Sequence, residues 1–541
     1  MFTDMSKAKT DKTASPKTAR KDRAAEIANT LEWLITAFML AFIFRAFIME
    51  AFRIPTGSMA DTLKGAHYRL RCCQCGYKYD YGFEPQRFNL PQDTIPHGYI
   101  KPFHSRCSSC GYYQPTGGAM QIINGDRILV LKCIYQFFEP QRWDVVVFKN
   151  PLDPSINYIK RLIARPEETV EIIDGDIYID GQISRKPPKV QNELWMPVYD
   201  NDYQPVRPRE GLFNGHFWQQ PFNIAGSKWE IDKADRRKFR LSSPSDQINY
   251  LSYDSSAGNN FRATYAYDEI KEYDYMPYCS DLMVRFYAEP AGQKGVIGIE
   301  LSKYKSRYRG WVDLAAGEMV IEQLSPGTAA NKLKRELVKQ PIAGRPALVK
   351  FANVDHQLIF QFGDEKLVFD LGRLPDDAGP RDTSIESEVK IFGSGKLTLS
   401  HIAVFRDIHY TAAIINSAYL SRAAEGNPFT LGKDEFFVLG DNSPSSADSR
   451  WWQRDGIKNN HQTYRKGIVP RDYLVGKALF VYWPGGFEFP WPKEVKIFLR
   501  NNSRKNGLLR VAYALVSLNW IPDVGGIRFI YGGSDKQINK K

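Results

Sequence analysis

The stretch Ile54-Pro55-Thr56-Gly57-Ser58-Met59 begins directly after an apolar run and places a serine among turn-forming residues. Proline and glycine beside a serine favour a tight turn that can expose the hydroxyl group. A lone serine in a turn is usually only a turn residue, and its hydroxyl needs a base before it can act as a nucleophile at neutral pH. Ser58 is therefore a candidate nucleophile only if a base from elsewhere in the chain reaches it.

The apolar run before this serine is uninterrupted over Trp33–Phe44 and continues beyond Arg45. A membrane span needs about 20 residues, and Leu31–Phe52 reaches that length with Arg45 near one end, where its side chain can extend to the interface. We expect an uncleaved transmembrane anchor at residues 29–50. A cleaved secretory signal, for which no clear Ala-x-Ala site follows the run, and a buried amphipathic helix are the alternatives.

The segment before the anchor, residues 1–28, is polar and carries seven basic and four acidic side chains, a net charge of +3. This composition predicts a disordered basic tail. Basic residues are enriched on the cytoplasmic side of membrane spans, so we expect the N-terminus to be cytoplasmic. The rest of a single-pass chain then faces the exoplasmic side of the cell (inner) membrane.

A candidate base lies in the stretch Tyr158-Ile159-Lys160-Arg161-Leu162-Ile163. Strand alternation places Lys160 on one face of a strand, and a lysine on a solvated face is the usual case. To act as a base, this amine must have its pKa lowered from about 10.4 to about 7–8. That shift requires burial among apolar groups without a carboxylate partner.

Five sequence boxes, taken in order, resemble the type I signal peptidase family, the S26 Ser/Lys serine proteases. They cover about 190 of the 541 residues, and five boxes in one order are more specific than any one alone. The boxes are residues 44–59, with the Pro-Thr-Gly-Ser-Met core; Gly125-Asp126-Arg127-Ile128-Leu129-Val130; Tyr158-Ile159-Lys160-Arg161; Gly440-Asp441-Asn442 with Ser446-Ala447-Asp448-Ser449-Arg450; and Val469-Pro470 with Gly476-Lys477-Ala478.

The resemblance implies a mainly β protein, with a signal-peptidase-like antiparallel β catalytic core behind an N-terminal transmembrane helix. It implies a signal peptidase I that removes signal peptides from exported preproteins and needs no cofactor for catalysis. Ser58 would attack the scissile carbonyl and Lys160 would take its proton. Supporting roles would fall to the Ser58 N–H and the Thr56 hydroxyl as oxyanion donors, to Ser446 in orienting the lysine, and to Asp441, Asp448 and Arg450 in bracing the loop.

Two departures from the family pattern lie beside the catalytic positions. The family usually continues after Lys160-Arg161 with a Gly-x-Pro-Gly-Asp turn, where this chain has Ala164-Arg165-Pro166-Glu167-Glu168. Ser443-Pro444-Ser445 replaces the usual Arg-x-Asn of the fourth box. These changes concern the loop geometry more than the chemistry.

Two Cys-x-x-Cys-Gly pairs mark a first insertion at residues 71–118; they are Cys72 with Cys75, and Cys107 with Cys110. Each pair resembles a zinc knuckle, and four thiolates suit tetrahedral Zn²⁺. We expect a zinc-ribbon-like insertion with a structural zinc ion, in which Cys73 could substitute for Cys72. Two local disulfides are the alternative, because an exoplasmic compartment is oxidising.

A second insertion, residues 186–430, alternates apolar and polar residues in runs separated by turns, which predicts a jelly-roll-like β-sandwich. Its clearest strands are residues 348–351, 358–362, 367–369 and 397–405. The hairpin into Gly363-Asp364 weakly resembles concanavalin-like jelly rolls, which often bind glycans. A glycan or protein ligand and a spacer or substrate-recruiting role all stay open, while His356 and Trp311 fit packing roles better than a sugar site.

The two insertions divide the catalytic core into residues 51–70, 119–185 and 431–500. A C-terminal membrane-proximal segment, residues 501–541, completes the chain. Within it, residues 508–516 predict a core or interfacial helix, which is too short and has too many charges nearby for a second span.

Composition and charge indicate which kinds of binding partner to expect. The chain is 43% hydrophobic and 25% charged, as in ordinary globular proteins. Its formal net charge of +12 is spread along the sequence without a basic-aromatic motif, so we expect signal peptides and membrane lipid as partners, not nucleic acid.

The rival interpretations are a membrane-anchored binding protein with an inactive protease scaffold and a Ser/Lys autoprotease. The latter is disfavoured, because no Ala-Gly cleavage site precedes Ser58.

Overall fold

The computed structural model is mainly β, as predicted. Two compact units divide the chain, Met1–Glu50 and Ala51–Lys541. Residues 1–22, most of the expected basic tail, lie outside the described residues. The structure describes residues 23–91, 99–102, 104–115, 118, 120–268, 276–325, 327, 329–338, 344–412, 421–457, 463–486, 492–502, 507–516 and 523–533.

The first unit contains a long apolar helix. Helix α1 (Arg23–Ile43) continues into a π-helical turn, η1 (Phe44–Ile48). The most apolar 18-residue window within the 23 residues Glu26–Ile48 has a mean hydropathy of 1.9, and this helix is long and apolar enough to cross a membrane. None of the most apolar window is buried, so this is not the buried core helix considered as an alternative.

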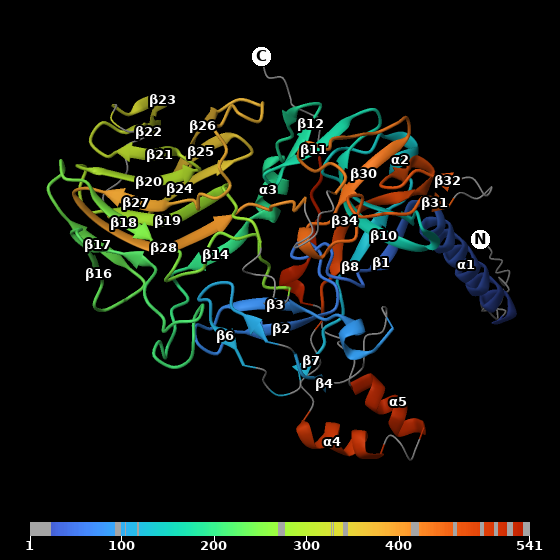
Figure 1. The fold of residues 1–541 in the computed structure, drawn as a ribbon. Coiled ribbons are helices and arrows are strands. Elements are labelled where there is room, and N and C mark those ends of the chain that lie inside the picture. Colours follow the sequence, from blue (N-terminus) through green and yellow to red (C-terminus); the bar gives the residue numbers. More distant parts are fainter. Residues whose placement is uncertain are drawn as a thin grey trace, which may run out of the picture. The chain divides into compact units, whose positions relative to one another are not determined.

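The segments that resemble the S26 core form an eight-stranded sheet in the order β1-β8-β34-β9-β10-β30-β33, with β35 pairing β34. Strands β1, β8, β10, β30 and β34 of this sheet are labelled in Figure 1. Val145 and Val147 pack into a cluster on one face, and Val146 and Phe148 into a cluster on the other. Burial on both faces explains why this strand is an unbroken apolar run. The strands are β1 (Met49–Arg53), β8 (Arg127–Leu131), β9 (Val145–Asn150), β10 (Asp153–Ala164), β30 (Glu435–Leu439), β33 (Val469–Pro470), β34 (Leu474–Trp483) and β35 (Arg528–Phe529).

A four-stranded sheet, ordered β13-β12-β11-β29, shares a core with the large sheet through Ile163 and Phe437. Its strands are β11 (Thr169–Ile173), β12 (Asp176–Ile179), β13 (Gln182–Ile183) and β29 (Phe429–Thr430). Nearby short elements are α2 (Ile134–Phe137), α3 (Pro188–Leu194), β31 (Gly456–Ile457) and β32 (Thr463–Tyr464).

The cysteine pairs lie at the turns of two hairpins. Strands β2 (His67–Arg71) and β3 (Lys78–Gly82) flank the first pair, and β5 (Ser105–Arg106) and β6 (Tyr113–Gln114) flank the second. A further two-stranded sheet joins β4 (Tyr99–Ile100) to β7 (Met120–Gln121). Cys72, Cys107 and Cys110 are themselves part of a small apolar core.

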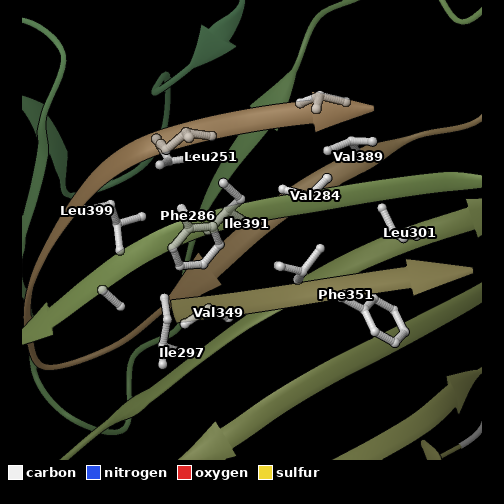
Figure 2. Packing of buried hydrophobic residues seen from close by; sticks show 14 of the residues in the cluster. Leu251, Val284, Phe286, Ile297, Leu301, Val349, Phe351, Val389, Ile391 and Leu399 are labelled. Atoms are coloured by element: carbon white, nitrogen blue, oxygen red, sulfur yellow. The ribbon is translucent and has the colours of Figure 1, made fainter. Parts of the chain in front are cut away.

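The region expected to be the second insertion forms two larger sheets around a shared apolar core, and we call this region the two-sheet insertion (Figures 1 and 2). The sheet orders are β16-β17-β28-β19-β24-β25-β26, with β14 pairing β28, and β15-β18-β27-β20-β21-β22-β23. The strands in chain order are β14 (Met196–Asp200), β15 (Phe222–Asn223), β16 (Trp229–Ile231), β17 (Phe239–Ser242), β18 (Asn249–Tyr253), β19 (Leu282–Pro290), β20 (Val296–Lys303), β21 (Ser306–Asp313), β22 (Glu318–Leu324), β23 (Asn331–Leu337), β24 (Ala347–Val354), β25 (Gln357–Phe362), β26 (Glu365–Asp370), β27 (Val389–Gly393) and β28 (Lys396–Arg406).

The core of this insertion follows from strand alternation. Val284 and Phe286 on β19 point into the same cluster as Ile297 on β20 and Ile391 on β27, which belong to the other sheet (Figure 2). The four runs singled out in the sequence lie in β24, β25, β26 and β28. His356, at the turn between β24 and β25, is buried, as expected of a packing residue.

Two helices, α4 (Lys493–Asn502) and α5 (Gly507–Val516), follow strand β34. Leu508 and Val511 on α5 are exposed, so the predicted helix is present but these side chains are not core residues. Strand β35 then pairs with Phe480 and Val481 of β34. This return of the C-terminal segment to the core sheet was not predicted.

Candidate active site

Ser58 and Lys160 lie in direct contact. Ser58 is in the turn after β1, and Lys160 is on β10, paired with Val146 of β9. The Lys160 Nζ lies 2.7 Å from Ser58 Oγ and donates a second hydrogen bond of 3.0 Å to Ile159 O. Both residues are buried, with 9% of Ser58 and 5% of Lys160 exposed. The structure thus brings together two residues that are 102 positions apart in sequence.

Burial lowers the pKa of Lys160 to about 8. The Asp448 and Asp441 carboxylates oppose this shift, and the Arg450 guanidinium adds to it. An amine with this pKa is partly neutral at physiological pH, and only the neutral amine can accept a proton from a hydroxyl group. The pair therefore has both the contact and the protonation that a nucleophile and its base require.

Each of the two acids whose charge acts on Lys160 is paired with an arginine. Arg161 donates two hydrogen bonds to the Asp441 carboxylate, at 2.8 and 2.7 Å. Arg450 donates two to Asp448, at 2.8 and 2.6 Å. All four side chains are fully buried. Among the described residues, no carboxylate comes within ion-pair distance of Lys160, because each acid already has its own guanidinium.

The loop after β30 packs closely on the serine. The Asn442 N–H donates to Ser58 O at 3.1 Å, and the Gly440 N–H donates to the Asp448 carboxylate at 3.0 Å. A Cβ on Gly440 would lie 2.4 Å from Ser58 O and 2.2 Å from Ser446 Oγ. Position 440 therefore has no room for a side chain.

Thr56 and Ser446 flank this contact without bonding to the lysine. Thr56 is half-buried, and Ser446 Oγ is buried without a hydrogen-bond partner among the described residues. The two hydrogen bonds of Lys160 go instead to Ser58 Oγ and Ile159 O. The expected roles of Thr56 and Ser446 therefore stay predictions.

Sequence reasoning missed residues that hold the serine loop. The Asp126 carbonyl accepts from the Ile54 N–H at 2.8 Å, and its carboxylate accepts from the Lys64 N–H at 3.1 Å. Asp126 lies inside a box that was quoted only for its strand pattern. Tyr265 and Tyr267, which also contact this region, belong to the two-sheet insertion, and no motif marks them.

The four paired cysteines converge on one point. Their sulfur atoms all lie within 4.8 Å of one another, with Cys72 Sγ 3.7 Å from Cys110 and Cys75 Sγ 3.6 Å from Cys107. All four are free thiols, and a disulfide would bring the sulfurs to about 2.05 Å. A tetrahedral ion with about 2.3 Å metal–sulfur bonds has sulfur–sulfur edges of about 3.8 Å. The cluster can therefore hold a metal ion.

The two hairpin turns have matching backbone geometry. Gly76 and Gly111 adopt positive φ angles of 77° and 74°, as a tight turn requires. Their N–H groups donate to Cys72 O at 2.8 Å and Cys107 O at 3.0 Å. Cys73 is exposed and does not belong to the cluster, so Cys72 is the residue that completes it.

Residues 108–219 and 409–483 match the family model described as signal peptidase, peptidase S26. These parts of the chain are similar to signal peptidases. The matched segments contain Lys160 and the loop at 440–450, whereas Ser58 lies before them.

Signal peptidase I of Rickettsia conorii is 30% identical over 218 residues, which are 40% of this chain and 59% of the relative. For Rickettsia akari the match is 31% over 188 residues, covering 34% of this chain and 50% of the relative. For Rickettsia canadensis it is 33% over 157 residues, covering 28% and 44%. The chain spans about half the length of these curated relatives. The resemblance to signal peptidase I that the boxes predicted is confirmed over these parts.

Among solved structures, the carbohydrate binding module CBM66 from Bacillus subtilis has a TM-score of 0.23 at 7% identity, covering 34% of this chain and 96% of its own. Sheep galectin-11 has a TM-score of 0.18 at 15% identity, covering 24% and 92%.

Proposed function

We propose that this chain is a membrane-bound serine endopeptidase that removes N-terminal signal peptides from exported preproteins. The observation that carries the proposal is the 2.7 Å contact between Ser58 Oγ and the Lys160 amine, whose pKa burial lowers to about 8. Similarity of the surrounding segments to signal peptidase I supports the substrate class. No cofactor takes part in the proposed reaction.

In the proposed mechanism, neutral Lys160 accepts the Ser58 Oγ proton as Oγ attacks the scissile carbonyl carbon. The Ser58 N–H and the Thr56 hydroxyl donate to the oxyanion. Ser446 Oγ, which is buried without a hydrogen-bond partner among the described residues, accepts from the Lys160 ammonium and orients it. The ammonium then gives its proton to the leaving amine, and the peptide bond breaks to leave an ester on Ser58. Lys160 next takes a proton from water, whose oxygen attacks the ester, and returns it to Ser58 Oγ.

Placement at the membrane follows from the sequence of the first unit. Helix α1 with its π-helical turn is the proposed single-pass anchor, and the basic tail before it is cytoplasmic. Ser58 follows this helix by a few residues, which suits cleavage just beyond a substrate's own membrane-inserted stretch. We also propose that the chain divides into a catalytic core and two insertions. A glycan or protein ligand for the two-sheet insertion is a separate proposal.

The test is cleavage of a model preprotein in detergent by the full chain and its variants. Ser58→Ala and Lys160→Met should each reduce cleavage by about 10³-fold or more, because a nucleophile and its base act as a unit. Lys149→Met is the matched control, since Lys149 is an exposed lysine on the neighbouring strand β9, and it should keep wild-type activity. Unchanged cleavage by Ser58→Ala or Lys160→Met would leave the inactive binding scaffold as the better account.

Zinc is the proposed ion of the four-cysteine cluster, because four thiolates in a tetrahedron are its preferred structural site. Metal analysis of purified protein should find about one equivalent of zinc, which Cys107→Ser should abolish. Cys73→Ser is the control, since Cys73 is exposed and outside the cluster. Zinc-free protein with all four thiols oxidised would favour the disulfide alternative.

A further inference from the structure

A short segment of the two-sheet insertion lies on the serine loop. Residues 263–268 precede β19, and within them Tyr265 and Tyr267 are 3% and 5% exposed. The two tyrosines pack in one apolar cluster with Ala60, which follows Ser58 by two residues. The insertion therefore reaches the candidate active site at a point that no catalytic box predicts.

Tyr267 covers the backbone beside the nucleophile. Its hydroxyl donates to Ala66 O at 3.0 Å, and its carbonyl accepts from the Gly82 N–H at 2.8 Å. A Cβ on Gly57 would lie 2.2 Å from ring carbon Cε1 of Tyr267. The ring thus rests directly on the residue before Ser58, and its hydroxyl secures the end of the same loop.

Tyr265 and Asp268 form hydrogen bonds to the loop at 441–442. The Tyr265 hydroxyl donates to Asp441 O at 3.1 Å. The Asn442 side-chain N–H donates to the Asp268 carboxylate at 2.8 Å, while the Asn442 backbone N–H donates to Ser58 O at 3.1 Å. Asn442 therefore connects the inserted segment to the nucleophile itself.

We propose that residues 263–268 act as a positioning strap for catalysis. Tyr265, Tyr267 and Asp268 are positioning residues that hold the serine loop and the loop at 441–442 in register, so that Ser58 Oγ stays within reach of Lys160. A nucleophile displaced by about 1 Å can lose about 10²-fold in rate, so the anchoring of these two loops bears directly on catalysis. This inference rests on the proposed function and deepens it, because it gives the insertion a part in the same reaction.

The strap predicts a defect in turnover with little change in KM. Tyr267→Phe keeps the ring on Gly57 but removes the hydrogen bond to Ala66, and it should lower kcat about 3–10-fold with KM within about twofold. Tyr308→Phe is the matched control: Tyr308 is a buried tyrosine of the same insertion whose hydroxyl donates to Ala378 O at 3.3 Å. It should leave both kinetic parameters unchanged.

Asp268 provides a rescue test. Asp268→Ala removes the acceptor for Asn442 and should lower kcat about tenfold, whereas Asp268→Asn keeps an acceptor oxygen and should retain most of the activity. Equal losses for the alanine and asparagine variants, or an effect on KM alone, would overturn the strap.

Hydrogen exchange separates this inference from the proposed function. The Ala60, Leu63 and Ala66 N–H groups donate within the serine loop, and their exchange should be about tenfold faster in Tyr267→Phe than in the wild type or in Tyr308→Phe. If the wild type cleaves no signal peptide, the proposed function fails, while faster exchange still supports the strap. Unchanged exchange in Tyr267→Phe would overturn the strap whether or not the chain is a peptidase.

Discussion

The side chains of Lys160 and Lys186 are both buried, yet the pKa values of the two lysines shift in opposite directions. Burial lowers the pKa of Lys160 to about 8 because no carboxylate is paired with it. Burial also lowers the pKa of Lys186, but the carboxylates of Asp355 and Asp407 outweigh that effect and raise it well above its ordinary value. The partner, not the burial, decides whether a lysine can serve as a base.

Lys186 belongs to an acidic junction between the four-stranded sheet and the two-sheet insertion, formed by Asp176, Asp281, Asp355 and Asp407. Lys186 Nζ lies 2.9 Å from Asp407, and Lys303 Nζ lies 3.8 Å from Asp176. Two ammonium groups thus occupy the junction as structural cations. At the candidate active site, the buried carboxylates of Asp441 and Asp448 are neutralised by arginines instead. Lys160 is therefore left without an acidic partner among the described residues.

In this comparison, the largest expected effect comes from removing an arginine at the candidate active site. Arg450→Met leaves the Asp448 carboxylate buried without its guanidinium, which should lower the free energy of unfolding by about 3–5 kcal/mol. It should also raise the pKa of Lys160, so cleavage at pH 7 should fall about tenfold and the pH–rate profile should move to higher pH.

The control for this variant is Arg309→Met, which breaks a partly buried pair with Glu300 inside the two-sheet insertion. Its stability should fall while its pH–rate profile stays at the wild-type position. If the pH–rate profile of Arg450→Met stayed at the wild-type position, the charge of Asp448 would have no effect on the pKa of Lys160, and the account would be contradicted.

At the acidic junction we expect a loss of stability of the same size but no effect on catalysis. Lys186→Met leaves Asp355 and Asp407 without their ammonium and should lower the free energy of unfolding by about 3–5 kcal/mol, measured by denaturant unfolding. Adding Asp407→Asn should recover part of that loss. The pH–rate profile of the folded protein should not change, and a shift would mean that the two lysines do not have the separate roles described above.

The smallest effect concerns Lys160 itself. Its folded-state pKa of about 8 lies below the unfolded value of about 10.4, so between these values the unfolded chain binds more protons and stability rises with pH. Below pH 8 both states are protonated and the cost of burying the charge is constant. Lys160→Met should therefore raise the free energy of unfolding at pH 7 by about 1–3 kcal/mol, with the gain shrinking toward pH 10. A Lys160→Met variant that is less stable than the wild type at pH 7 would contradict a free-energy cost of burying the charged amine.

Short contiguous motifs were the predictable part of the site. The residue types around Ser58, Lys160 and Asp448 are those that the proposed chemistry needs, and each box is read without knowledge of the fold. Alternation likewise predicted strands of the two-sheet insertion, because one face of each strand is buried. The cysteine spacing predicted a four-thiol cluster for the same local reason.

Tertiary packing supplied what the sequence could not. Lys160 contacts Ser58 across 102 residues of chain, and Tyr267 reaches Gly57 across more than two hundred. Strand β35 returns to β34 after two helices, with only two residues to signal it. Contacts of this kind leave no local pattern, since each side chain looks like an ordinary core residue.

The most direct measurement is the titration of the Lys160 amine, followed by NMR with carbon-13-labelled lysine and assigned by the loss of one signal in Lys160→Met. A buried amine free of acids, as described above, predicts an ionisation near pH 8, matched by a rise in kcat/KM through the same pH. An ionisation near 10.4, with kcat/KM insensitive to pH around 8, would contradict the account.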